Sequence, residues 1–186
     1  MDLKQAIYGR RSIRQFTGTP VGEGALVELI NAAVQAPSAV NEQPWSFYVV
    51  RNRERLARLS TEAKDYLMRT ASTAAMSTHF RETLGDPAND IFHGAPVLIV
   101  IASQFDSVWA TEDCALAAEN LMLLAYSMGL GTCWIGSAQS YLQTPHGRAA
   151  VGLESHHRAV APIIVGHPRA LQQSVPRRPA DVHWID

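Results

Sequence analysis

The chain has 186 residues, of which 47% are apolar and 18% charged, and its formal net charge is −1. This composition is typical of a single globular domain over residues 1–186, and it gives no electrostatic reason to expect nucleic acid or an anionic membrane as partner. No apolar run is long enough to cross a bilayer and no signal peptide is recognisable, so we expect a cytoplasmic protein that does not bind membranes.

A short helix followed by a cluster of arginines is predicted at the N-terminus. Asp2 can cap this helix and Gly9 can end it. The next five residues, Arg10 to Arg14, read RRSIR and carry three guanidinium groups. Guanidinium groups match phosphate oxygens in a bidentate manner, and Ser12 adds a hydroxyl donor. The alternative is a solvated basic cluster that is favoured by the dipole at the end of the helix.

An amphipathic helix is predicted over residues 22–36, and it leads into a loop that reads APSAVNEQPWSF. Pro37 ends the helix, and Pro44 is expected to hold the residue before it in an extended conformation. Between the two prolines, short polar side chains are available for a flat polar ligand, namely Ser38, Asn41 and Gln43. The alternative is a plain helix-to-strand connection in which these side chains form only local turns.

The middle of the chain predicts a strand over 46–51, a helix that begins after Asn52, and a less regular region from Met68 to Asn89. This region is rich in small and polar residues, and we interpret it as a helical cover over a site. The candidates for substrate contact in this region are Met76, His79 and Phe80, and ordinary packing is the alternative.

A buried central strand is predicted over 97–101, where five apolar residues follow a proline. His93, just before it, is interpreted as a structural residue. The longest helix is predicted from Ser107 to Met128 and is apolar nearly all round, so it needs cover on every side, in part from a second subunit. Glu119 and Asn120 within it need polar partners, which solvent or an interface would supply.

A glycine-rich stretch, GLGTCWIGS, follows this helix. Gly129 is expected to cap the helix, and the order helix-then-strand excludes a dinucleotide-binding fingerprint. Gly136 closes a short strand and would let backbone amides approach a ligand; a plain strand-to-loop turn is the alternative.

The last elements are predicted as a short helix over 141–151 and a strand over 159–166, in which Pro162 indicates an edge or a bulge. His156 and His157 would point to opposite faces of a strand, so no metal site is predicted. Cys114 and Cys133 lack the spacing of a metal or redox motif and are expected to be reduced thiols.

The C-terminal tail carries Arg177 and Arg178 between two prolines. A solvated end is the ordinary interpretation. Trp184 and Ile185 are too apolar for a free end, and we expect them to dock, with a partner chain as one candidate surface.

Two of these motifs, RRSIR and APSAVNEQPW, together resemble the nitroreductase family of FMN-dependent NAD(P)H oxidoreductases. The resemblance covers most of the chain, from Asp2 to about Pro179. It implies that Arg10, Arg11 and Ser12 hold the FMN phosphate and ribityl oxygens, and that Arg14 approaches the N1–C2 carbonyl edge of the flavin. The other residues that it implies as cofactor contacts are Pro37, Ser38, Ala39, Asn41, Gln43, Ile135, Gly136, Ser137, Arg177 and Arg178.

The resemblance also leaves one contact open. A C-terminal basic segment completes the phosphate site in the family, and Arg177 matches it best. Val175 stands where many relatives carry another basic residue, which would shift the contact to Arg178.

The implied fold is α+β, a small and mostly antiparallel sheet wrapped by helices in an intertwined homodimer with FMN at the subunit interface. The implied activity is a ping-pong, NADH- or NADPH-driven reduction of small organic acceptors such as nitroaromatics or quinones, in which the flavin and no side chain carries the chemistry. The alternatives are a non-redox FMN carrier or regulatory protein, and a family member with oxidative chemistry on a specific metabolite.

Overall fold

The computed structural model describes residues 1–71, 76–170, 172 and 175–185, and a central antiparallel sheet organises this part of the chain. Its strands lie in the order β1-β2-β4-β3, and every pairing between them is antiparallel. Their bounds are β1 Trp45–Val50, β2 Val97–Ser103, β3 Gly131–Trp134 and β4 Arg158–Gly166. The predicted α+β fold with a small antiparallel sheet is therefore confirmed.

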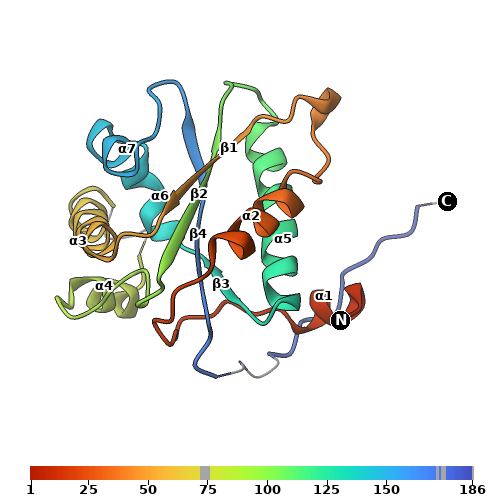
Figure 1. Cartoon of the computed structure of the whole chain (residues 1–186), viewed down its shortest axis with the longest axis horizontal. Coiled ribbons are helices and arrows are strands. Elements are labelled where there is room, and N and C mark those ends of the chain that lie inside the picture. The colour runs from red at the N-terminus through yellow and green to blue at the C-terminus, as the bar shows by residue number, and fades with distance from the viewer. Residues whose placement is uncertain (72–75, 171, 173–174, 186) are drawn as a thin grey trace.

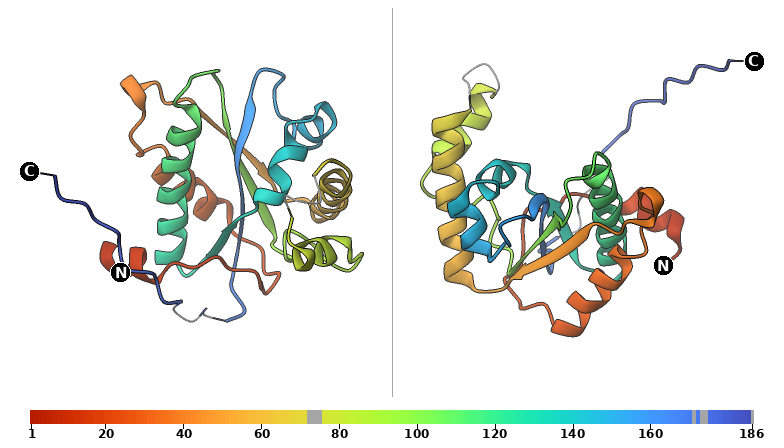
Figure 2. Two further views of the ribbon diagram at one scale, coloured as in Figure 1. Left: turned by 180° about the vertical axis from the view of Figure 1, so that it is seen from behind. Right: turned by 90° about the horizontal axis from the view of Figure 1, so that it is seen from above.

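Helices cover both faces of the sheet (Figure 1). Their bounds are α1 Leu3–Gly9, α2 Glu23–Ala33, α3 Arg53–Thr70, α4 Thr78–Gly85, α5 Ala110–Ser127, α6 Gly136–Leu142 and α7 Pro145–Val151. Helices α3, α4, α6 and α7 lie on one side, and α2 and α5 lie on the other. A ribbon viewed from above shows the same three layers (Figure 2).

Strand β2 is buried along its whole length because both of its faces are covered. Leu98 and Val100 belong to the core under α3 and α6, whereas Ile99 and Ile101 belong to the core under α2 and α5. Alternate residues of a strand point to opposite faces, so a doubly covered strand has no polar side. The prediction of a central strand is confirmed.

Strand β4 lies between β2 and β3, so the predicted edge position for Pro162 is wrong and the bulge is observed instead. The register shifts so that Ile101 pairs with Ala161 and Ala102 pairs with Ala159, which leaves Val160 as the extra residue. Pro162 still accepts a hydrogen bond, since its carbonyl oxygen lies 2.8 Å from the amide nitrogen of Ile135. In an antiparallel pair the N–H and C=O of one residue face the same neighbour, so the missing N–H of Pro162 faces Ile135, where β3 has already ended.

The predicted helix caps are confirmed. Asp2 forms a capping box with Gln5, and the Asn52 side chain accepts from the amide of the third residue after it at 2.8 Å. Gly129 has φ +73°, and the amide of Leu130 donates to the Ala125 carbonyl at 2.8 Å. That pattern is a Schellman motif, which requires a left-handed residue after the helix and explains the glycine.

The stretch after β3 differs from the prediction of one helix over 141–151. Helix α6 already begins at Gly136, and a second helix, α7, begins at Pro145. Pro145 cannot continue α6, and Thr144 caps α7 by accepting from the Gly147 amide at 3.0 Å. Gly136 therefore opens a helix rather than only closing a strand.

The adjacent histidines also differ from the prediction. His156 lies in a turn between α7 and β4, and His157 precedes the first residue of β4. The two rings do not point to opposite faces, because their centroids are only 4.4 Å apart. The geometric reason for excluding a metal was therefore wrong.

Helix α5 buries one face, with eight of its 18 residues buried, whereas Leu116 is 47% exposed, so the predicted cover on every side is not complete within one chain. Glu119 and Asn120, for which polar partners were expected, find them within the chain. Glu119 forms an ion pair with Arg10 at 3.2 Å, and the Asn120 side chain donates to the Ala32 carbonyl at 3.3 Å. Both partners come from helices or turns packed beside α5, so neither polar group needs a subunit interface.

The predicted cover region, Met68 to Asn89, contains the end of α3 and all of α4, while residues 72–75 lie outside the described part of the chain. Met76 packs against the core, and Phe80 remains 40% exposed. No helix among the described residues is long and apolar enough to span a membrane.

The C-terminal tail leads away from the body of the molecule (Figures 1 and 2). All residues of 175–185 are exposed, including Trp184 at 87% and Ile185 at 94%. Within one chain these two side chains do not dock, so docking on a partner chain stays a prediction.

Candidate functional site

The RRSIR segment lies against β3, although the two are more than 100 residues apart in the sequence. Ser12 forms a parallel bridge with Thr132, and the Ile13 amide donates to the Thr132 carbonyl at 2.9 Å. Ile13 is buried so closely on Gly131 that a Cβ there would lie 2.8 Å from its side chain. Only glycine permits this approach, which fixes the segment on the edge of the sheet.

The first two arginines of the segment have structural partners. The Arg10 Nε atom is paired with Glu119, and one Nη atom of Arg11 donates to the carbonyls of Tyr8 and Arg10 at 2.9 and 2.6 Å. A pocket of about 160 Å³ opens beside both arginines, with Thr132 also in its lining. Arg11 thus satisfies carbonyls at the end of α1 and at the same time brings positive charge to the pocket.

Arg14 is exposed and lines a second, more polar pocket of about 390 Å³. Arg53, His93 and Arg169 line the same pocket. Burial lowers the pKa of His93, and the charge of Arg14 lowers it further, although Asp90 acts in the opposite direction. The pocket therefore concentrates positive charge from three separate segments of the chain, which favours an anionic or electron-rich ligand edge.

Ile135, Gly136 and Ser137 lie directly after β3, the strand with which Ser12 forms its bridge. A Cβ added to Gly136 would meet no atom within 4 Å, so a ligand has room to approach its backbone. The first amides of a helix have no partner inside that helix, and Gly136 opens α6. Contact between these backbone amides and a ligand stays a prediction.

The loop between Pro37 and Pro44 holds an unusual backbone. Val40, Asn41 and Gln43 have φ of +43°, +60° and +49°, a region that L-residues rarely adopt. The extended conformation predicted for Gln43 is therefore wrong. Its amide donates to the Ser38 hydroxyl at 3.0 Å, and its side chain donates to Asn41 at 3.1 Å, which stabilise the left-handed turn.

Asp113, at the start of α5, supports this loop and was missed by the sequence analysis. Its Oδ1 atom accepts from the Ala39 amide at 3.1 Å, and the residue is only 4% exposed. Its Oδ2 atom has no hydrogen-bond partner among the described residues. A carboxylate in the first turn of a helix usually indicates only a favourable interaction with the helix dipole, so the sequence carried no signal for this role.

The predicted flavin contacts fall into groups that one chain does not bring together. Ser12 lies beside β3, at the edge where Thr132 pairs with Val165 near the end of β4. The 37–44 loop precedes β1 on the other edge, at the end where Ser103 pairs with both Trp45 and Arg158. Arg177 and Arg178 belong to the exposed tail.

A separate polar cluster lies where the turn after α7 meets β1. The Tyr48 hydroxyl lies 2.6 Å from Nδ1 of His157, which is 5% exposed. Burial lowers the pKa of His157, with further lowering by His156 and Arg148 and an opposite effect of Glu154. The folded protein therefore favours a neutral imidazole at this position.

We expect the free energy of unfolding to fall as the pH drops below about 6.5, where histidine in the unfolded chain takes up protons. The folded state, with its lowered His157 pKa, binds fewer protons there, so protonation favours unfolding. Urea unfolding at pH 7.5 and 5.5 should show a smaller loss of stability in His157→Gln than in the wild type. His183→Ala, in the exposed tail, is the matched control. An equal loss in His157→Gln and in the wild type would contradict the assignment.

The family model named Nitroreductase family matches residues 7–167. The chain belongs to the nitroreductase family. A relative from Methanothermobacter thermautotrophicus, provisionally named an NADH dehydrogenase/NAD(P)H nitroreductase, is 33% identical over 141 residues. That match covers 73% of this chain and 61% of the relative, so the chain spans less than two thirds of that relative's length.

Two further nitroreductase relatives extend the comparison. A protein of the same provisional name from Archaeoglobus fulgidus is 29% identical over 163 residues, with coverage of 88% of this chain and 83% of that relative. The crystal structure of a nitroreductase with bound FMN from Bacteroides fragilis superposes with a TM-score of 0.87, at 24% identity and full coverage of both chains. At that identity the likeness shows a shared fold.

Proposed function

We propose that this nitroreductase-family protein is an FMN-dependent oxidoreductase that uses NADH or NADPH to reduce small organic acceptors, such as nitroaromatics or quinones, in a ping-pong cycle. A cytoplasmic location accompanies this proposal. When bound, FMN supplies the electron transfer chemistry, and the side chains bind it, orient it and set its electrostatic surroundings.

One observation carries the proposal. The RRSIR segment is held against β3 through the contacts of Ser12 and Ile13 with Thr132, and the Ile135–Ser137 segment follows directly after the same strand. Arg10 and Arg11 line one pocket, Arg14 lines another, and the backbone at Gly136 is open to approach. Phosphate binding by arginine and serine, together with backbone contact to a flat ring, is what FMN requires.

The same geometry supports a homodimer with FMN at the interface. The 37–44 loop and the RRSIR segment lie at opposite edges of the sheet, about 14 Å apart across three strand spacings. They also lie at opposite ends of β4, about 24 Å apart along the strand. One chain therefore offers two half-sites, and a second copy related by a two-fold axis would complete each of them.

Exposed apolar side chains agree with this arrangement. Val108 is 82% exposed, Trp109 57% and Val40 91%, all near the loop that would reach the partner chain. The tail adds Trp184 and Ile185. Large apolar side chains that stay exposed in one chain commonly mark an interface.

The function is tested by a turnover screen. Purified, FMN-loaded protein should oxidise NADH or NADPH only when a nitroaromatic or quinone acceptor is present, apart from a slow reaction with oxygen. The contradicting result is protein that holds stoichiometric FMN but oxidises neither nucleotide with any acceptor, which would favour a flavin carrier.

We expect the FMN-loaded protein to sediment as a dimer at all concentrations at which it stays folded. Interfaces that complete a hydrophobic core rarely dissociate into folded monomers. Analytical ultracentrifugation should also show that truncation after Pro179 weakens the dimer, because Trp184 and Ile185 are removed. A compact, FMN-loaded monomer would refute this arrangement.

A further inference from the structure

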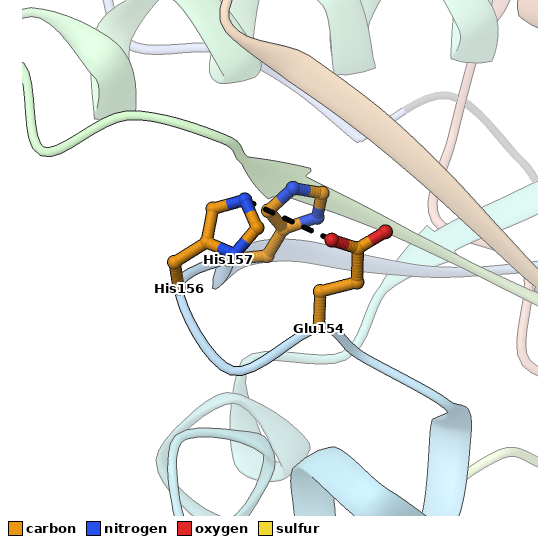
Figure 3. A group of neighbouring side chains, drawn as sticks. All are labelled: Glu154, His156 and His157. Atoms are coloured by element: carbon orange, nitrogen blue, oxygen red, sulfur yellow. Dashed lines mark ion pairs between the residues drawn. The ribbon is translucent and has the colours of Figure 1, made fainter.

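The turn between α7 and β4 gathers two imidazoles and a carboxylate (Figure 3). One ligand atom from each of Glu154, His156 and His157 lies within 4.8 Å of the others. The His156 Nε2 atom is 3.8 Å from a carboxylate oxygen of Glu154. Around a tetrahedral zinc ion, Zn–N distances of about 2.0–2.1 Å place ligand atoms about 3.3 Å apart. Small rotations of His156 and Glu154, whose side chains are 62% and 64% exposed, suffice to close that difference.

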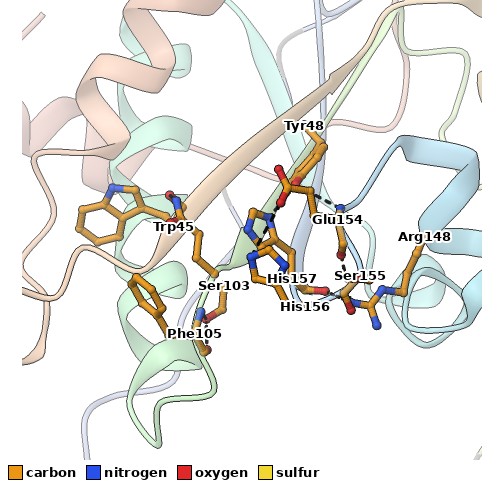
Figure 4. A network of polar contacts seen from close by, with 10 residues as sticks. Trp45, Tyr48, Ser103, Phe105, Arg148, Glu154, Ser155, His156 and His157 are labelled. Carbon is orange, nitrogen blue, oxygen red and sulfur yellow. Dashed lines mark hydrogen bonds and ion pairs between the residues drawn. The ribbon is translucent and has the colours of Figure 1, made fainter.

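The backbone of this turn is held in place before any ligand binds. Arg148, on α7, donates from one Nη atom to the carbonyls of Glu154, Ser155 and His157, the first at 3.1 Å (Figure 4). Three carbonyls on one guanidinium nitrogen fix the path of the turn. The Arg148 guanidinium points at these carbonyls. The negative charge of Glu154 lies among the three donor side chains and offsets the repulsion between Arg148 and a bound metal ion.

Tyr48 gives His157 the hydrogen bond that metal-binding histidines usually make through their second nitrogen. Its hydroxyl lies 2.6 Å from Nδ1 of His157 and also accepts from the Glu154 amide at 3.4 Å. A hydroxyl oxygen can accept from both, in which case Nδ1 carries the proton and Nε2 presents its lone pair. A hydrogen bond of this kind orients a histidine ligand and fixes its tautomer.

The donor set decides the kind of ion. Two imidazoles and one carboxylate suit Zn²⁺ and related first-row divalent ions, whereas Ca²⁺ and Mg²⁺ prefer oxygen ligands alone. Both cysteines are buried, and burial raises the pKa of the Cys114 thiol to about 12. Neither thiol therefore competes for the ion at the surface.

We propose that Glu154, His156 and His157 form a binding site for one divalent first-row transition-metal ion, with Zn²⁺ as its probe and water completing the coordination. The site lies at the start of β4, whereas Ser12 lies beside the strand that pairs with the end of β4. It does not depend on the proposed oxidoreductase activity, because none of its residues belongs to the predicted flavin contacts.

The test uses full-length protein, loaded with whatever flavin it retains, stripped with EDTA and freed of any histidine tag. Competition with a chromogenic chelator should reveal one Zn²⁺ per chain with a micromolar or lower Kd. His156→Ala and Glu154→Gln should each weaken binding by about tenfold or more. His146→Ala is the matched control, because His146 is an exposed imidazole 3.5 Å from Glu62 in a pair that lacks the third donor. It should bind zinc as the wild type does.

The proposal is overturned if the wild type binds no zinc below about 100 μM, or if His156→Ala binds as tightly as the wild type. Both altered side chains are exposed, and circular dichroism in EDTA checks that the variants stay folded. If one of them does not fold, zinc-edge X-ray absorption of the wild type decides the question. Two imidazole ligands on zinc support the site, and fewer than two refute it.

Discussion

Replacing Arg10 by alanine is expected to weaken FMN binding about 10- to 100-fold. A charge-assisted hydrogen bond contributes about 1.5–3 kcal/mol, and a factor of ten in Kd is about 1.4 kcal/mol. Arg10 lies at the mouth of the pocket beside Thr132, and its ion pair with Glu119 holds the side chain there. Pre-positioning of this kind lowers the entropy that binding would otherwise cost.

Glu119→Gln separates the two roles of this ion pair. Glu119 is 44% exposed in its side chain, and an exposed ion pair contributes about 0–1 kcal/mol. FMN affinity in Glu119→Gln should therefore stay within about fivefold of the wild type, while Arg10→Ala should lose far more. Titration of apoprotein with FMN, followed by flavin fluorescence, measures both. Equal losses in the two variants would show that Arg10 acts only by holding α1 against α5.

Arg177→Ala tests whether the C-terminal tail takes part in FMN binding. The tail is exposed along 175–185, so Arg177 contributes to FMN binding only if the tail folds back or crosses to a partner chain. A loss of affinity in Arg177→Ala that matches the loss in Arg10→Ala would indicate that the tail reaches the phosphate. If Arg178→Ala and not Arg177→Ala loses FMN affinity, the phosphate contact is shifted to Arg178, as Val175 suggests.

The features that sequence predicted well are those with a local cause. Asp2 and Asn52 cap helices through their own neighbouring amides, and Gly129 adopts the left-handed conformation that ends α5. The apolar run of β2 is buried on both faces, as an uninterrupted apolar strand must be. The caps and the burial of β2 each depend on residues that lie only a few positions away in the sequence.

The features that sequence missed depend on distant partners. Pro162 lies in a central strand because the side that lacks its N–H faces Ile135, just after β3 has ended, and nothing near Pro162 in the sequence indicates where β3 ends. Gln43 is left-handed because the Ser38 hydroxyl and the Asn41 side chain hold it, against the usual effect of a following proline. His157 meets Tyr48, which is 109 residues away in the sequence.

The candidate site shows the same division. Family resemblance located the RRSIR and Ile135–Ser137 segments, and in the structure the first is held against Thr132 of β3 while the second follows the end of that strand. It gave no indication of Asp113, whose buried carboxylate holds the loop at Ala39. It also did not reveal that Arg53 and Arg169 share a pocket with Arg14.

Arg14→Ala is expected to lower the reduction potential of the bound flavin by about 30 mV, which is 1.4 kcal/mol for a two-electron couple, and to slow hydride transfer from NAD(P)H. Reduction adds negative charge near the N1–C2 carbonyl edge of a flavin, and a fixed cation beside that edge favours the reduced form. Arg14 lines its pocket with Arg53 and Arg169, which remain in the variant and limit the loss. FMN should stay bound, because Arg10 and Ser12, the predicted contacts of its phosphate and ribityl oxygens, are unchanged in this variant.

Arg53→Ala is the matched control, since it removes a guanidinium from the same pocket but from the start of α3 rather than from the segment beside β3. If general positive charge in the pocket sets the potential, the two variants should shift it equally. If Arg14 acts directly on the flavin edge, its shift should be the larger. A spectroscopic redox titration of fully loaded protein measures both, and an unchanged potential in Arg14→Ala would show that Arg14 has no such role. Stopped-flow reduction by NADH then measures the rate of hydride transfer in each variant. A ping-pong cycle requires parallel double-reciprocal plots in both variants, and intersecting plots would exclude that cycle.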